Sequence, residues 1–137
     1  MADEDNVEVI AGGKSDAEYK SDIANREREC TKALNMGKPQ DALPIALADP
    51  PIYTKTQAIK DQNATVVLSL LGGFKEKDIE ASVNGLNDDQ LDVLMKYIYR
   101  GLAAGENSAV FLKWHEVVLK KGGMGTIIRT ISEKKTV

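Results

Sequence analysis

Apolar residues recur every three or four positions along most of the chain, from about residue 24 to residue 132. This spacing is typical of amphipathic α-helices, and no stretch shows the strict alternation of a half-buried strand. The segments that carry the pattern are 24–36, 39–48, 54–71, 75–84, 87–104, 107–121 and 124–132. The connections between them are short, which favours antiparallel neighbours. The pattern therefore predicts an all-α fold of about seven short helices in antiparallel hairpins.

Glycine, proline and capping residues mark where several of these helices begin and end. Gly37 is placed to end the first helix, and Pro39 to begin the second, because a helix tolerates proline in its first turn. Thr54 and Gln57 have the spacing of a capping box, and Asn87 stands where an N-cap is needed. In the last predicted helix the apolar side chains form one line: Met124, Ile127, Ile128 and Ile131.

The N-terminal part of the chain has a different character. Residues 1–30 contain nine acidic and four basic residues, a net charge of −5, whereas residues 31–137 carry +2. Few large apolar residues occur before residue 24, too few to offset the entropy lost on ordering. We therefore predict a flexible acidic arm over residues 1–23 and an all-helical body over residues 24–137.

The few apolar residues of this arm are grouped. They are Val7, Val9, Ile10, Tyr19 and Ile23, and the last two have helical spacing. One interpretation is a tail that only keeps the protein in solution. The other is a segment that becomes ordered on a partner, with these five side chains docking and the acidic residues setting the register.

The composition of the chain excludes several classes of protein function. The chain has 137 residues, 42% of them hydrophobic, which suffices for one modest core. Its net charge of −3 argues against a nucleic-acid partner. No apolar run approaches the roughly 20 residues that span a bilayer, and the N-terminus does not resemble a signal peptide. A single cysteine suits a reducing compartment, and a single histidine excludes a multi-histidine metal site. We expect an intracellular protein without catalytic activity, metal or cofactor.

Three features invite a catalytic interpretation, and none supports it well. The glycine pairs at 72–73 and 122–123 lack the lysine and hydroxyl residue of a phosphate-binding loop. His115 and Glu116 are adjacent on a helix and point in different directions, and residue 119 is leucine where a zinc-binding helix needs histidine. Cys30 lacks the cationic neighbourhood of a reactive thiolate. A structural role is therefore favoured for each.

Aromatic and basic residues suggest contacts with a protein partner. Tyr97 and Tyr99 flank the apolar Ile98 and cannot share one helix face, so they do not form a base-stacking platform. Tyrosine and arginine at a partly buried edge are typical interface anchors. Packing beside the core is the favoured interpretation and partner contact the alternative. The candidate partner-binding residues of the body are Tyr53, Tyr97, Tyr99 and Arg100.

Several stretches together carry a family resemblance. They are Asp49-Pro50-Pro51-Ile52, Thr54-Lys55, Gln57-Ala58-Ile59-Lys60-Asp61, Leu94-Met95-Lys96-Tyr97-Ile98-Tyr99, Gly101, Trp114-His115-Glu116, Gly122-Gly123-Met124-Gly125, Arg129 and Lys135-Thr136-Val137. In this order and spacing, over about residues 30–137, the body resembles subunit 5 of the actin-related protein 2/3 complex. The arm matches in character only, with Asp16-Ala17-Glu18-Tyr19 as its one similar element.

This resemblance implies a function. It implies a non-catalytic subunit of a seven-subunit complex that nucleates branched actin filaments in the cytoplasm and cytoskeleton, with ATP bound by the actin-related subunits. It also implies a body similar to an α-α superhelix that docks on subunit 4 beside the β-propeller subunit. The arm would tether an actin-related protein, and actin filaments would be contacted only indirectly. The alternative is a free-standing helical scaffold outside the actin machinery.

Overall fold

The structure, a computed structural model, describes residues 14–133 and 135–137. These residues form seven α-helices and no β-strand, as predicted. The helices are α1 (Asp16–Asn35), α2 (Pro39–Leu47), α3 (Gln57–Gly72), α4 (Glu76–Asn84), α5 (Asp88–Ala104), α6 (Ser108–Gly122) and α7 (Met124–Ser132). The all-α fold class is confirmed.

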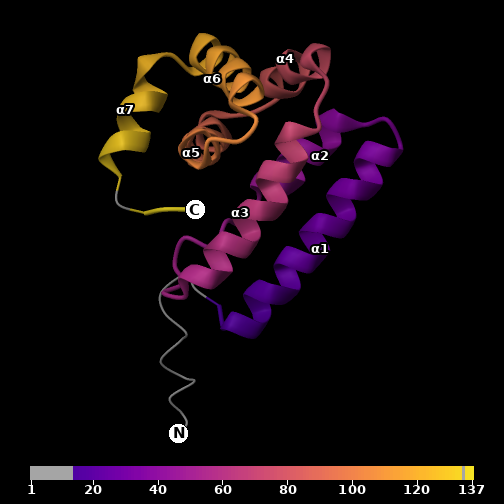
Figure 1. Ribbon diagram of the computed structural model, residues 1–137, viewed down its shortest axis with the longest axis vertical. Helices are drawn as coiled ribbons and strands as arrows, with labels where there is room; N and C mark the ends of the chain where they lie inside the picture. Colours follow the sequence, from indigo (N-terminus) through magenta and orange to yellow (C-terminus); the bar gives the residue numbers. More distant parts are fainter. Residues whose placement is uncertain (1–13, 134) are drawn as a thin grey trace, which may run out of the picture.

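Each helix packs against the next helix along the chain or the next but one (Figure 1). α2 packs on α1, to which a short turn joins it, and α3 lies beside α1. α4 contacts α2 and α6, while α5 packs between α6 and α7 and also touches α3. The first three helices and the last four thus form two groups, joined through α2, α3, α4 and α5.

The first helix begins earlier than the sequence pattern predicts. Ser15 caps α1 by accepting a hydrogen bond from the backbone N–H of Glu18, whose side chain accepts one in return. Tyr19 and Ile23 are only 5% and 2% exposed, and they form a second small core with Ile59. The predicted boundary at residue 23 is therefore wrong for residues 16–23, which belong to the body.

The remaining part of the predicted arm, including Val7, Val9 and Ile10, lies outside the described residues. The flexible arm stays a prediction for residues 1–13.

The other predicted helix ends are mostly confirmed. Gly37 follows α1 in the left-handed region, with φ of 74°, where glycine carries no steric penalty. Asn87 caps α5 in a capping box with Gln90. The capping box predicted at Thr54 is wrong, because α3 begins at Gln57. The Thr54 hydroxyl instead accepts a hydrogen bond from the Thr56 N–H at 3.1 Å.

The main core is centred on Trp114. Its side chain is fully buried, and its indole N–H donates to the Leu71 carbonyl at 3.1 Å, which ties α6 to the end of α3. The Phe74 ring meets it edge to face, with centroids 5.1 Å apart. Gly101 lets α5 approach α6 closely, since a Cβ at this position would lie 2.9 Å from the Phe111 ring.

A buried polar network connects the two groups of helices. We use this name for Arg26 of α1, Asn63 of α3 and Tyr97 of α5 with their hydrogen bonds. The Arg26 guanidinium donates to the Asn63 side-chain oxygen, and to the carbonyls of Ala48 at 2.6 Å and Asp49 at 3.0 Å. The Asn63 amide donates to the Tyr97 hydroxyl at 2.6 Å. All three side chains of the network are buried, so each bond replaces one that water would otherwise make.

Removing Arg26 should destabilise the fold. In Arg26→Leu, two backbone carbonyls and the Asn63 oxygen lose their donor inside the protein, and we expect the free energy of unfolding to fall by about 3 kcal/mol. Urea unfolding followed by circular dichroism measures this loss. The matched control is Arg28→Leu, because Arg28 is exposed on the same helix and, among the described residues, bonds Asn25 of the same helix alone. Equal unfolding midpoints for the two variants would contradict the importance of the network.

Candidate interaction surfaces

The structure shows how the residues that invited a catalytic interpretation are arranged. Nowhere in residues 14–133 and 135–137 do three or more His, Cys, Asp or Glu side chains lie where they could hold a metal ion. His115 Nε2 lies 3.0 Å from the Tyr99 hydroxyl, whereas the Glu116 carboxylate pairs with Lys113. The two side chains do not converge, in agreement with a structural role for His115.

None of the helices described in the structure is both long and apolar enough to span a membrane.

The thiol of Cys30 is buried and inert. Cys30 is 2% exposed, and its Sγ–H donates to the Ala42 carbonyl at 3.5 Å. Burial raises the pKa of the thiol to about 11, and the nearby Arg26 charge opposes this rise only in part. The thiolate, which is the nucleophilic form, is therefore disfavoured at neutral pH.

The structure separates the predicted partner-binding residues into two sets. Tyr97 is fully buried in the main core, so the prediction of a partner contact is wrong for it. Tyr19 and Ile23 are likewise covered by the chain itself. Tyr99 and Arg100 lie half-buried on the outer side of α5 and remain candidates.

Tyr53 also remains a candidate, in the loop between α2 and α3. It is half-buried, and the ammonium of Lys135 lies 4.9 Å from its ring centroid and 3.3 Å from its hydroxyl. The last residues of the chain therefore lie against this loop.

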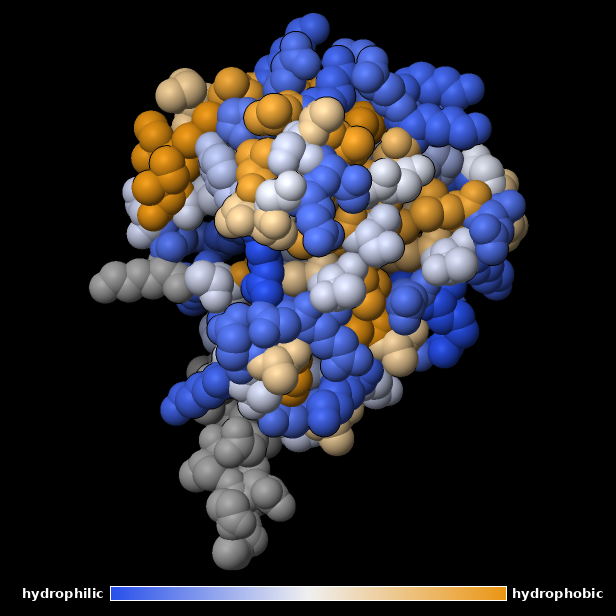
Figure 2. Space-filling model, in the orientation of Figure 1, coloured by the Kyte–Doolittle hydropathy of each residue, from blue (hydrophilic) through white to orange (hydrophobic). Residues whose placement is uncertain are grey.

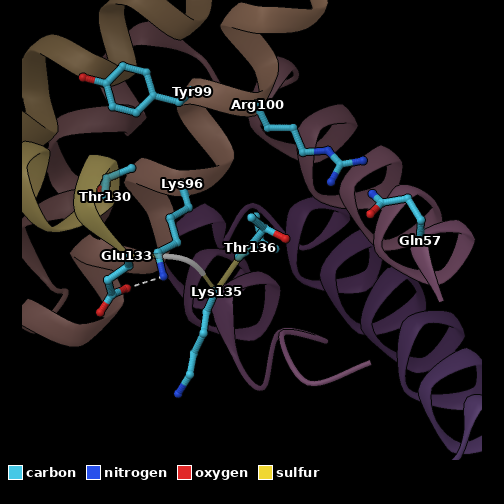
Figure 3. A pocket seen from close by; sticks show the side chains of 9 residues that line it. Gln57, Lys96, Tyr99, Arg100, Thr130, Glu133, Lys135 and Thr136 are labelled. Atoms are coloured by element: carbon cyan, nitrogen blue, oxygen red, sulfur yellow. Dashed lines mark hydrogen bonds and ion pairs between the residues drawn. The ribbon is translucent and has the colours of Figure 1, made fainter. Parts of the chain in front are cut away.

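A cavity of about 410 Å³ opens between the start of α3, the middle of α5, the end of α7 and the last residues of the chain (Figure 3). Its lining residues are Gln57, Lys96, Tyr99, Arg100, Thr130, Glu133, Lys135, Thr136 and Val137. Lys60 reaches its edge and donates to the Thr136 hydroxyl at 2.9 Å. We call this cavity, with the cations Lys60, Lys96, Arg100 and Lys135, the basic groove.

Two carboxylates partly balance these four cations. Glu133 pairs with Lys96, and Asp61 pairs with Arg100. Burial lowers the pKa of Lys60, and the neighbouring Arg100 charge lowers it further. Among the described residues the groove therefore keeps an excess of positive charge. Sequence reasoning named only Arg100 and Tyr99 here, because the cations are far apart in the chain.

A second surface consists of the outer side of α7. Met124, Ile128 and Ile131 are 61%, 58% and 75% exposed, although they lie in one line. The opposite side of the helix is held by buried Thr126, and Arg129 bonds Asp92 of α5 at 2.7 and 2.9 Å. Figure 2 shows the resulting hydrophobic patch over α7, at the upper left. We call these three side chains the apolar face of α7.

Comparison with known proteins identifies the family. A family model described as ARP2/3 complex 16 kDa subunit (p16-Arc) matches residues 2–137. The chain belongs to this family. It is 78% identical to actin-related protein 2/3 complex subunit 5 of Dictyostelium discoideum over 135 residues, which cover 98% of both chains.

The family extends to animals. The chain is 42% identical to subunit 5-C of Xenopus laevis over 113 residues, covering 81% of this chain and 75% of that protein. It is 44% identical to a mouse subunit 5-like protein over 106 residues, covering 76% and 69% respectively. The resemblance drawn from the sequence is confirmed.

The buried thiol should make stability depend on pH. In the folded state the pKa of Cys30 is raised from 9.0 to about 11. The contribution of the protonated thiol to the free energy of unfolding is therefore complete below pH 9 and is lost as pH rises through 11. We expect a loss of about 2 kcal/mol over this range, measured by urea unfolding at each pH. Burial likewise raises the pKa of Tyr97, to about 12, so the decline in stability continues to higher pH. Cys30→Ala should lower stability at pH 8 yet flatten the slope between pH 9 and 11, and an unchanged slope would refute this.

Proposed function

We propose that the chain is a non-catalytic structural subunit of the actin-related protein 2/3 complex, which nucleates branched actin filaments in the cytoskeleton. The observation that carries the proposal is the 78% identity to subunit 5 over 98% of both chains. The buried thiol of Cys30 and the hydrogen bond of His115 to Tyr99 give both side chains structural roles. Neither a cofactor nor a nucleic acid enters this function.

The body acts by docking on other subunits, subunit 4 and the adjacent β-propeller subunit. The apolar face of α7 supports this, because three large apolar side chains on an ordered helix gain most by being covered. The helix is held in place by the Arg129–Asp92 pair, so it can present this face without refolding. Tyr53, Tyr99 and Arg100 are secondary candidates for subunit contacts.

Residues 1–13 act as a tether to an actin-related protein. Since residues 16–23 are part of α1, only about 13 residues remain for this role, with a reach of about 45 Å when extended. Val7, Val9 and Ile10 are the apolar side chains available for docking. A short covalent link raises the local concentration of its target and so keeps it close during rearrangement.

Capture from a native extract tests the proposed function. A tagged copy of this chain should recover two actin-related proteins and a β-propeller subunit in equal amounts, as identified by mass. Recovery of the chain alone would instead support a free-standing helical scaffold.

The same capture tests the docking face. Ile128→Arg combined with Ile131→Arg should reduce recovery of the other subunits at least about tenfold, because charged side chains would be buried at the interface. Met36→Arg is the matched control, since Met36 is 57% exposed but caps the C-terminal end of α1, outside α7. The variants should keep their helical circular dichroism. Full recovery with the double variant would show that α7 does not form the interface.

Removal of residues 1–13 should separate assembly from activity. The truncated chain keeps the whole of α1 and both cores, so it should enter the complex at the normal stoichiometry. Without the tether, the nucleation rate in a pyrene–actin assay should fall several-fold. A matched control replaces residues 1–13 with a glycine–serine segment of equal length. Normal nucleation by either complex would rule out the tether.

A further inference from the structure

We propose that the basic groove binds the acidic residues 1–13 of the same chain whenever no partner holds them. This interaction surface concerns the chain by itself, so it stands or falls independently of the proposed role in actin nucleation.

The charges of the two parts are complementary. Residues 1–13 contain Asp3, Glu4, Asp5 and Glu8 and no basic residue. The groove gathers cations from α3, α5 and the last residues of the chain, and Asp61 and Glu133 pair with two of them. In Figure 3 the side chains of Lys96 and Arg100 extend from α5, and that of Lys135 extends in another direction from the last residues of the chain. A carboxylate placed beside Lys60 and Arg100 would relieve the repulsion between these two charges.

The acidic segment is attached close to the groove. The carboxylate of Asp16, in the first turn of α1, accepts a hydrogen bond from the Thr56 hydroxyl at 2.9 Å. Thr56 is followed directly by Gln57, which lines the groove. From the other side, Lys135 contacts Tyr53 of the same loop. The loop that receives the start of α1 therefore also forms one edge of the groove.

Length and linkage favour this occupant over an acidic segment of another molecule. Glu8 is six residues from Lys14 and can reach about 20 Å, and Asp3 can reach about 38 Å. A covalently linked segment has an effective concentration of about a millimolar, so contacts too weak to hold a free peptide are sufficient. Exposed ion pairs are weak in this sense.

Carbodiimide cross-linking of the full-length chain tests the proposal, because this reagent joins only carboxylates and amines already in contact. In low salt we expect the peptide containing residues 1–14 to be linked to Lys60 and Lys135, but not to Lys120 or Lys121, which are exposed at the end of α6. The yield should fall about tenfold in about 0.5 M salt. The ion pair of Lys14 with Asp22 provides an internal positive control.

A pair of matched variants makes the test specific. Arg100→Gln removes one groove charge while leaving both reporting lysines, and should lower the yield about threefold. Lys113→Gln is the control, since Lys113 also pairs with a single carboxylate on the surface but lies on α6 and does not line the groove. An equal effect of the two variants would overturn the proposal, as would equal linking to Lys120 and Lys121.

Isotope labelling distinguishes the remaining occupants. Nitrogen-15-labelled and unlabelled chains are mixed before cross-linking. We expect links within one chain, which join two labelled peptides or two unlabelled peptides and never one of each. Links of mixed mass would mean that a second copy fills the groove. Linking of an added glutamate-rich peptide in place of residues 1–13 would mean that the groove serves acidic segments of other proteins. Both results, and a complete absence of links to the groove, contradict the proposal.

Discussion

The guanidinium of Arg26 fixes the position of α1, and much of the remaining fold follows from it. Placing a cation in the interior costs several kcal/mol unless hydrogen bonds compensate it, and Arg26 donates from both terminal nitrogens to Asn63 and two backbone carbonyls, while its Nε has no partner among the described residues. One of these carbonyls belongs to Asp49, whose φ of 52° places it in the left-handed region. The loop after α2 is thus shaped to face Arg26. Asn63, which accepts from Arg26, also donates to Tyr97 of α5, so the position of the second group of helices depends on the same network.

Local signals in the sequence are sufficient to predict the helices, but not to predict which helices pack against one another. Gly37 and Asn87 act through bonds within a few residues, so their roles could be predicted. Tyr19 and Ile23 have the same helical spacing in an isolated arm as in a body helix. Only Ile59, distant in the chain, decides between the two, and no local pattern indicates that contact. The capping box at Thr54 failed similarly, because this loop is also bonded to Asp16.

The same reasoning explains what could be predicted of the surfaces. Spacing established that Tyr97 and Tyr99 point in different directions, but not which of them faces inward. That is decided by Asn63, which bonds Tyr97 from another helix. The alignment along α7 was evident in the sequence, yet a line of apolar residues looks alike whether it is covered or exposed. The groove was not foreseen, because its cations meet only after α3, α5 and the last residues are brought together.

The contacts at the start of α1 have a mechanical consequence. Lys14 pairs with Asp22 and Asp49, and Asp16 is bonded to Thr56, so the chain is fastened to two neighbouring segments at the point where α1 begins. A pulling force on residues 1–13 would first load these bonds and then act along α1 toward Arg26. Because α1 lies along α2 and α3, such a load shears several contacts at once instead of peeling them apart in turn. The first helix is thus anchored so that it resists a force applied to the segment before it.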